Sequence, residues 1–217
     1  MSEMGMTVFR LEDGTYHCQF ETHLPLMGVL RVMWVTQAAA RTGATTVLDL
    51  AGGNGEMSRF ISKWAKVTVL DCDAKNEEAA MKVGVQKFIH ARLQDSPSLF
   101  SEKFGAILLC EILEHAKDKE EASEWVKIAA SLGEYVIITT PYERGWHSSA
   151  HPFTNPEHLL YWTDTSLLFA IGEADVQILF WDRISWLGYS YYFIVVSANK
   201  KSGYDFFSSS DVRAVLV

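Results

Sequence analysis

The sequence TVLDLAGGNGE, residues 46–56, joins a short apolar run to a glycine-rich turn. Good helix formers follow at residues 56–64, so the pattern predicts a strand, a turn and a helix. Glycines allow positive φ angles and let a ligand approach the backbone closely, and the N-terminus of a helix directs free N–H groups and a positive dipole end at the turn. Such a turn, at the carboxyl edge of a parallel sheet, is a typical cradle for a nucleotide-like ligand.

The glycine spacing separates this turn from two other nucleotide-binding loops. A dinucleotide fingerprint needs a third glycine that is missing here, and a P-loop needs a lysine directly after the turn. The remaining pattern resembles motif I of the class I S-adenosylmethionine (SAM) dependent methyltransferases, an acid-x-G-x-G-x-G sequence. Asp49 takes the acid position, Gly53 and Gly55 take the second and third glycines, and Ala51 beside Gly52 replaces the first. The alternative is a tight strand-to-helix turn that binds no ligand.

The apolar run at residues 67–71 predicts a second strand that ends in Asp71. In nucleotide-binding α/β folds, an acid about 20 residues past the turn binds ribose hydroxyls, since a carboxylate accepts from two vicinal O–H donors at once. Asp71 is therefore the predicted ribose ligand, Asp73 is its competitor, and Cys72 is a further predicted cofactor contact. A strand end exposed to solvent is the alternative interpretation.

A short helix with Asn76 as its N-cap and a strand at residues 86–90 are predicted next. The loop at residues 91–95 resembles the adenine loop of the same family. Arg92 stands where that loop often carries an aspartate for the adenine amino group. The resemblance therefore implies that backbone groups near Arg92 and Leu93, rather than a carboxylate, contact the adenine.

Residues 104–110 form a continuous apolar run, which is typical of a buried parallel strand. The run leads into Glu111 and then Leu113-Glu114-His115, which resembles the signature after the fourth strand of small-molecule methyltransferases. The resemblance implies that this strand end faces the methyl group, that Glu111 contacts the cofactor and that His115 is a candidate catalytic base. A histidine that only fixes its loop through hydrogen bonds is an equally good interpretation.

The polar loop at residues 143–155 follows a further predicted strand. Because loops on this edge of a sheet commonly carry function, Tyr142, His151 and Phe153 are predicted to contact the methyl acceptor. His147 is a second candidate base, with an ordinary pKa of ~6.5. His147 and His151 are four residues apart, but this spacing in a loop without a cysteine indicates a metal site only weakly, and no metal is expected.

The other elements complete an alternating pattern. Further helices are predicted over residues 25–40, 119–131 and 155–172, and further strands over residues 135–141, 176–181 and 189–196. Gly133 is the predicted C-cap of the second of these helices, and Asn155 the N-cap of the third. Alternating strands and helices argue for a doubly wound α/β sheet. The resemblance implies seven strands in the order 3-2-1-4-5-7-6, with strand 7 antiparallel, helices on both faces, and SAM as the cofactor.

The composition restricts the class of protein. The 217 residues are 48% hydrophobic and 21% charged, so the chain can bury a substantial core. The net charge of −8 does not favour a nucleic-acid interface, which needs a basic face. The N-terminus lacks the features of a signal peptide, the apolar runs are too short to span a bilayer, and the three cysteines are sparse. We therefore expect a cytoplasmic protein with no membrane partner, and the resemblance to small-molecule methyltransferases implies a small-molecule substrate.

One domain is expected over residues 1–200, with a helical or lid segment at 1–45 and a C-terminal tail at 201–217. Two other functions stay open at this stage. A SAM-binding regulatory or partner subunit would keep the glycine turn and the ribose acid but have no turnover. An NAD-type oxidoreductase is disfavoured by the missing third glycine and by the Leu113-Glu114-His115 signature.

Overall fold

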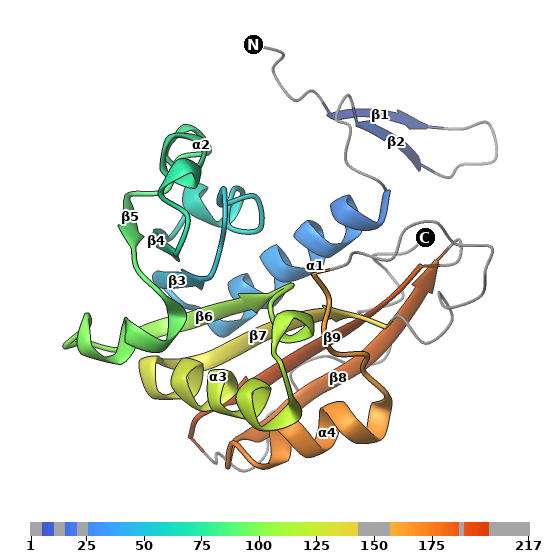
Figure 1. Cartoon of the computed structure of the whole chain (residues 1–217). Coiled ribbons are helices and arrows are strands. Elements are labelled where there is room, and N and C mark those ends of the chain that lie inside the picture. The colour runs from blue at the N-terminus through green and yellow to red at the C-terminus, as the bar shows by residue number, and fades with distance from the viewer. Residues whose placement is uncertain (1–5, 11–15, 21–25, 143–156, 187–188, 200–217) are drawn as a thin grey trace.

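The computed structural model describes residues 6–10, 16–20, 26–142, 157–186 and 189–199. A seven-stranded sheet lies at its centre (Figure 1). The strands are β3 (Thr46–Leu50), β4 (Lys66–Asp71), β5 (Lys87–His90), β6 (Phe104–Cys110), β7 (Gly133–Pro141), β8 (Gln177–Trp186) and β9 (Tyr189–Ser197). Their order is β5-β4-β3-β6-β7-β9-β8, and β9 is antiparallel to both neighbours. Counted from β3, this confirms the predicted order 3-2-1-4-5-7-6 with an antiparallel seventh strand.

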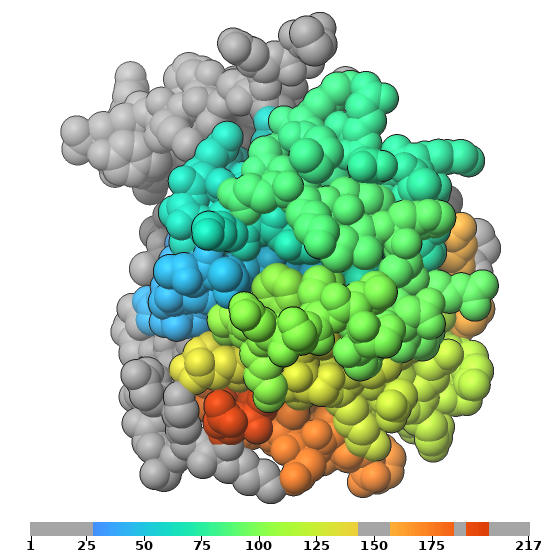
Figure 2. Space-filling view, turned by 90° about the vertical axis from the view of Figure 1, so that its left-hand side faces the viewer, coloured from blue at the N-terminus to red at the C-terminus, as the bar shows by residue number. Residues whose placement is uncertain are grey.

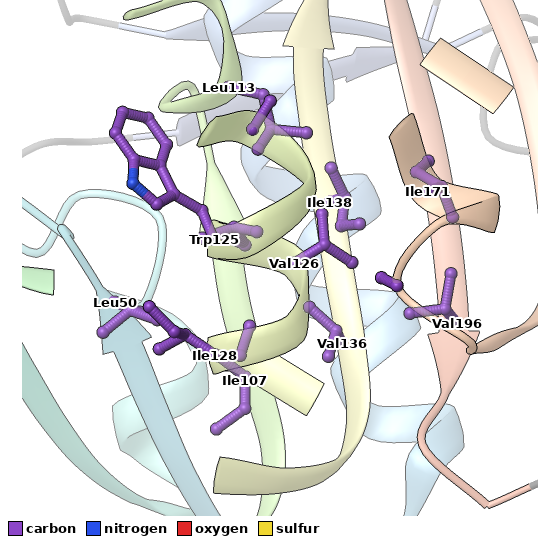
Figure 3. Close-up of a cluster of buried hydrophobic side chains, with 14 of the residues drawn as sticks. Leu50, Ile107, Leu113, Trp125, Val126, Ile128, Val136, Ile138, Ile171 and Val196 are labelled. Carbon is purple, nitrogen blue, oxygen red and sulfur yellow. The ribbon is translucent and has the colours of Figure 1, made fainter. Parts of the chain in front are cut away.

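Helices cover both faces because successive side chains of each strand point to opposite sides. On one face, α3 (Lys119–Leu132) and α4 (Asp164–Gly172) pack on a cluster that includes Leu48 and Ile138. Figure 3 shows this cluster, with side chains of α3 and α4 beside those of β7 and β9. On the other face, α1 (Leu26–Thr42) packs on a second cluster that includes Val47.

The elements follow one another across the sheet, so the two halves of the chain occupy different ends of the molecule. Figure 2 shows this from the side: the cyan and green surface of β3 to β5 lies at one end, and the orange surface of the α4 and β8 region at the other. A separate antiparallel pair, β1 (Met6–Arg10) and β2 (Tyr16–Phe20), precedes α1. No helix in the described ranges is long and apolar enough to cross a bilayer.

The helix predicted at residues 56–64 is absent. A series of turns and the short 3-10 helix η1 (Ile61–Lys63) take its place. Phe60 and Trp64 are exposed, so the segment has no continuous apolar stripe to bury against the sheet. The hydroxyl of Ser62 also lies 2.7 Å from the Arg59 carbonyl oxygen, the kind of local hydrogen bond that competes with a helical backbone.

Two predicted helix caps are confirmed in position, but neither has the usual cap geometry. Asn76, the last residue of η2 (Ala74–Asn76), is the N-cap of α2 (Glu77–Lys82), but its side chain makes no cap hydrogen bond. Gly133 is the C-cap of α3 and the first residue of β7, with an extended φ of −145° instead of a left-handed one. A Cβ there would lie 2.5 Å from Ile107 Cγ1, so close packing is the reason for the glycine.

The last helix begins later than predicted. Asn155 lies outside the described residues, and residues 157–163 are not helical. α4 begins at Asp164, after a capping box in which the Thr163 side chain accepts from the Ser166 N–H and the Ser166 hydroxyl accepts from the Thr163 N–H. The reciprocal bonds satisfy two N–H groups that the first turn leaves free, which places the helix start there.

Candidate active site

A cavity of about 580 Å³ opens at the carboxyl edge of the parallel strands. This is within the size range of small-molecule sites in proteins. It is lined by residues from the segments after β3, β4, β5 and β6 and from α3: Ala51, Leu70, Asp71, Cys72, Ala91, Arg92, Leu93, Gln94, Asp95, Ile112 and Trp125. Five of the ten predicted cofactor contacts are among them, namely Ala51, Asp71, Cys72, Arg92 and Leu93.

The glycine turn after β3 has the backbone that its sequence predicted. Ala51, Gly53 and Gly55 have φ angles of +58°, +53° and +75°, a region that only glycine enters without strain. Gly52 is needed for a different reason, since a Cβ there would lie 2.4 Å from Asp49 Cγ. The turn therefore lies directly against the carboxyl group of Asp49.

Asp71 joins this turn to the end of β4. Its Oδ2 accepts from the Gly53 N–H at 2.9 Å, and its Oδ1 accepts from the Asp73 N–H at 2.8 Å and from Asn76 Nδ2 at 3.1 Å. A carboxylate offers roughly four acceptor positions, so one is left for a ligand. Asp73 is exposed, accepts from the Lys75 N–H and does not line the cavity. Of the two competing acids, Asp71 lies at the cavity.

Asp49 lies beneath the turn and is buried, with 1% of its surface exposed. Its Oδ2 has no hydrogen-bond partner in the described part of the chain. Burial raises the pKa of Asp49 to about 7, the nearby charge of Asp71 acts in the same direction, and the Ser58 hydroxyl acts against it. Asp49 is thus a buried acid that a proton or a nearby cation would stabilise.

Trp125 of α3 lines the cavity, and sequence reasoning did not identify it as a site residue. Its indole Nε1 is buried and has no hydrogen-bond partner among the residues described. In the view of Figure 3 the ring points away from Ile171 and Val196 of the core cluster. Buried donors are normally satisfied, so this N–H fits a cavity whose ligand carries an acceptor atom. No pattern in the sequence distinguishes such a tryptophan from a core residue of the same helix.

Glu111 follows β6, and its side chain bonds to residues of α1 and β7. Glu111 Oε2 lies 2.6 Å from Arg31 Nη1 of α1, and Glu111 Oε1 accepts from Thr139 Oγ1 at 2.8 Å. The Arg31 guanidinium also lies 4.9 Å from the centre of the Tyr191 ring. Glu111 has a φ of +55°, a strained value that is common at functional sites. It does not line the cavity, although Ile112 does, so its cofactor contact stays a prediction.

The next residues form a compact cluster. Glu114 is buried, and its Oε2 accepts from Thr140 Oγ1 at 2.9 Å. Burial, and then the charge of Glu111, raise the pKa of Glu114 above its ordinary value. His115 Nδ1 lies 3.1 Å from the Glu157 carbonyl oxygen; a carbonyl only accepts, so Nδ1 donates and Nε2 is left as the acceptor. This contact fits the structural interpretation of His115, and its role as a base stays a prediction.

The predicted acceptor contacts are only partly within the described residues. Tyr142 packs edge-to-face on Tyr192, with ring centres 5.6 Å apart, and the Arg183 guanidinium lies 4.4 Å above its ring. These contacts hold Tyr142 toward β8 and β9. His147, His151 and Phe153 lie outside the described residues.

Comparison with known proteins adds a family match for the central part of the chain. Residues 48–137 match the family model described as a methyltransferase domain. This segment runs from β3 to β7 and includes every cavity-lining residue. Comparison with curated protein sequences finds no match.

Solved structures with the same fold include several methyltransferases. An O-methyltransferase family protein from Burkholderia thailandensis matches with a TM-score of 0.60 at 18% identity, over 77% of this chain but only 55% of that one. Magnesium protoporphyrin IX methyltransferase from Synechocystis PCC 6803, with S-adenosylhomocysteine (SAH) bound, matches with a TM-score of 0.60 at 18% identity, over 82% and 89%. The N-methyltransferase NodS from Bradyrhizobium japonicum matches with a TM-score of 0.57 at 12% identity, over 78% and 96%. At these identities the matches establish the fold.

Proposed function

We propose that the chain is a class I SAM-dependent methyltransferase, that SAM binds in the cavity at the carboxyl edge of β3 to β6 and that the methyl acceptor is a small molecule. One observation carries the placement of the cofactor. Residues from three separate motifs, represented by Ala51, Asp71 and Arg92, line the same cavity. In an open α/β sheet, ligands bind at this edge, where the strand order reverses on either side of β3.

The cavity offers a distinct contact for each part of the cofactor. The free acceptor position of Asp71 is suited to a ribose hydroxyl, and the segment at Arg92 and Leu93 to the adenine. The Trp125 indole N–H is available to a ligand acceptor, and the carboxyl of Asp49 beneath the turn favours a nearby positive charge. SAM supplies a methyl group already activated on a sulfonium, so the remaining task of these residues is to orient it and to exclude water.

The acceptor is proposed to bind beyond the end of β6. Two of the structural neighbours are an O-methyltransferase family protein and an N-methyltransferase, so this fold serves both kinds of acceptor atom. A hydroxyl acceptor needs a base, and His115 Nε2 is available because Nδ1 faces the Glu157 carbonyl. His147 is the second candidate base. The net charge of −8 favours a small molecule over a nucleic acid.

Calorimetric titration with SAH tests the cofactor site. We expect micromolar binding, about −8 kcal/mol. Asp71→Asn should weaken it by roughly 1.5–3 kcal/mol, the range for a hydrogen bond to a charged group. Asp73→Asn is the matched control and should leave it unchanged, because Asp73 lies outside the cavity. The proposal would be contradicted if Asp73→Asn weakened SAH binding and Asp71→Asn did not, or if the unmodified chain bound NADH and not SAH.

The acceptor class requires a turnover measurement. Small metabolites with hydroxyl, amine or activated carbon groups are incubated with SAM and the chain, and SAH release is measured. We expect release with a small molecule and none with oligonucleotides. SAH binding without turnover on any acceptor would instead favour a regulatory SAM-binding subunit.

A further inference from the structure

The cluster beyond β6 brings together three side chains that bind metals in other proteins. One potential ligand atom from each of Glu114, His115 and His158 lies within 4.8 Å of the other two. The two imidazole rings meet edge-to-face, with centres 5.0 Å apart. The backbone holds the two contributing segments together, because the N–H groups of Leu159 and Leu160 both donate to the Glu114 carbonyl oxygen, at 2.8 and 3.0 Å.

Neighbouring groups orient two of the three side chains. The contact of His115 Nδ1 with the Glu157 carbonyl leaves the Nε2 lone pair free. Metal-binding histidines almost always donate their other ring N–H to a carbonyl or carboxylate in this way. Thr140 Oγ1 donates to Glu114 Oε2 and fixes the carboxyl group beside the two histidines.

The buried carboxyl of Glu114 is also suited to bind a cation. Only 1% of its surface is exposed, and no ion pair to it occurs within the described ranges. The positive charge of Arg31 acts on Glu114, but its guanidinium bonds to Glu111. Buried carboxylates are normally paired with a cation or coordinate a metal. A cation between Glu114 and the two histidines would satisfy this group.

We propose that Glu114, His115 and His158 bind a divalent transition-metal ion, and that this ion binds an oxygen or nitrogen atom of the methyl acceptor. Two imidazoles and one carboxylate suit Zn²⁺, Mn²⁺, Fe²⁺ or Co²⁺ better than Mg²⁺. Three protein ligands leave a coordination position open, as in catalytic sites. Such ligands lie about 2.0–2.2 Å from the metal, so binding draws the three side chains closer by rotation.

The site rests on the proposed methyltransferase function and adds a class of acceptor to it. Glu114 lies two residues beyond Ile112, which lines the cofactor cavity. A metal there would hold a hydroxyl, a catechol-like diol or an amine beside the methyl donor. It would also favour loss of the proton from a bound hydroxyl, because a coordinated oxygen is more acidic. With its Nε2 lone pair on the metal, His115 would then act as a ligand and not as the general base.

Direct metal binding tests the proposal without turnover. The full chain is treated with a chelator and dialysed, then titrated with Co²⁺, Mn²⁺ and Mg²⁺, followed by calorimetry and by the visible absorption of bound Co²⁺. We expect one Co²⁺ per chain, with Co²⁺ and Mn²⁺ binding at least tenfold more tightly than Mg²⁺. His158→Ala and Glu114→Gln should each weaken Co²⁺ binding at least tenfold. His90→Ala, on β5, is the histidine control for metal binding and should match the unmodified chain.

The same proteins are titrated with SAH and checked by circular dichroism, so that a folding defect is recognised. His158→Ala is expected to keep its fold and its SAH affinity while it loses Co²⁺. Absence of binding by all three ions, or Co²⁺ binding by folded His158→Ala as tight as that of the unmodified chain, overturns the metal site. Loss of SAH binding by every protein, the unmodified chain included, overturns the cofactor proposal instead.

Discussion

At the scale of single residues, the glycine turn depends on an acid that the sequence identified only by position. The acid-x-G-x-G-x-G pattern placed Asp49 in the motif, but its burial arises from the packing of the turn. Gly52 approaches so closely that no Cβ fits between it and the carboxyl group. With Oδ2 unpartnered in the described structure, the charged form of Asp49 is unfavourable.

This burial predicts a particular pH dependence of stability. Between pH about 4 and about 7 the folded chain keeps a proton on Asp49 that the unfolded chain has released, so the free energy of unfolding falls as pH rises. The stability that the retained proton on Asp49 provides is fully present below the ordinary carboxyl pKa. It is lost as the pH rises past about 7, the pKa of Asp49 in the folded chain. The difference corresponds to roughly 4 kcal/mol. Urea unfolding at pH 4 to 8 should show this fall in the unmodified chain and a smaller one in Asp49→Asn, where the raised pKa of Glu114 still acts in the same direction.

The exposed Asp73 provides the control for this comparison. Asp73→Asn removes an exposed carboxyl and leaves Asp49 in place. The free energy of unfolding of this variant should therefore change with pH in the same way as that of the unmodified chain. Parallel pH profiles for the unmodified chain and Asp49→Asn would show that Asp49 is not protonated in the folded chain at pH 5 to 6.

At the scale of elements, the strands were predictable, whereas the helix expected at residues 56–64 and the start of the last helix were not. A continuous apolar run such as residues 104–110 is typical of a buried parallel strand, and β6 has those bounds. Residues 56–64 contain good helix formers, but the segment buries only part of its apolar surface: Ile61 lies in the core, whereas Phe60 and Trp64 are exposed. Asn76 has the side chain of a helix cap, and only the fold shows that Asp71 accepts its amide instead.

The pair between Arg31 and Glu111 is another case in which sequence reasoning fails, because its members are 80 residues apart. It connects α1 to the end of β6. Removing one member of a buried pair leaves the other uncompensated, which costs 3–5 kcal/mol in a deep interior. With side chains 17% and 22% exposed, Arg31→Met should destabilise the chain by about 1–3 kcal/mol. Chemical denaturation measures this change.

A double-mutant cycle separates the ion pair from simple packing loss. Arg31→Met/Glu111→Gln should be less destabilised than the sum of the two single variants, since neither charge is then left alone. Effects that add within about 0.5 kcal/mol would mean that the two side chains do not interact in solution.

At the scale of the whole molecule, the cavity exists because the sheet brings the ends of β3, β4, β5 and β6 to one edge. That convergence was predictable, since parallel strands with crossover helices place their carboxyl ends together. The contribution of Trp125 was not, because a helix on the sheet offers many apolar residues and only the packed structure shows which one lines the cavity. A ligand at this edge contacts four segments at once and should stabilise the fold as a unit.

A comparison of two glycines tests this coupling. Binding to the folded chain alone adds RT ln(1 + [L]/Kd), about 2.7 kcal/mol at one hundred times Kd, so SAH should raise the Tm of the unmodified chain by about 5–10 °C for a chain of this size.

Gly53 and Gly43 have φ angles of +53° and +69°, and an added Cβ would find no atom closer than 3.9 Å at either. Valine at either position therefore imposes a similar backbone strain, but only Gly53 lies in the turn at the cavity. Gly43→Val should melt at a lower temperature than the unmodified chain and keep the full SAH shift. Gly53→Val should melt at a similarly reduced temperature and lose the shift. An SAH shift of equal size in both variants would mean that the ligand does not approach the turn after β3.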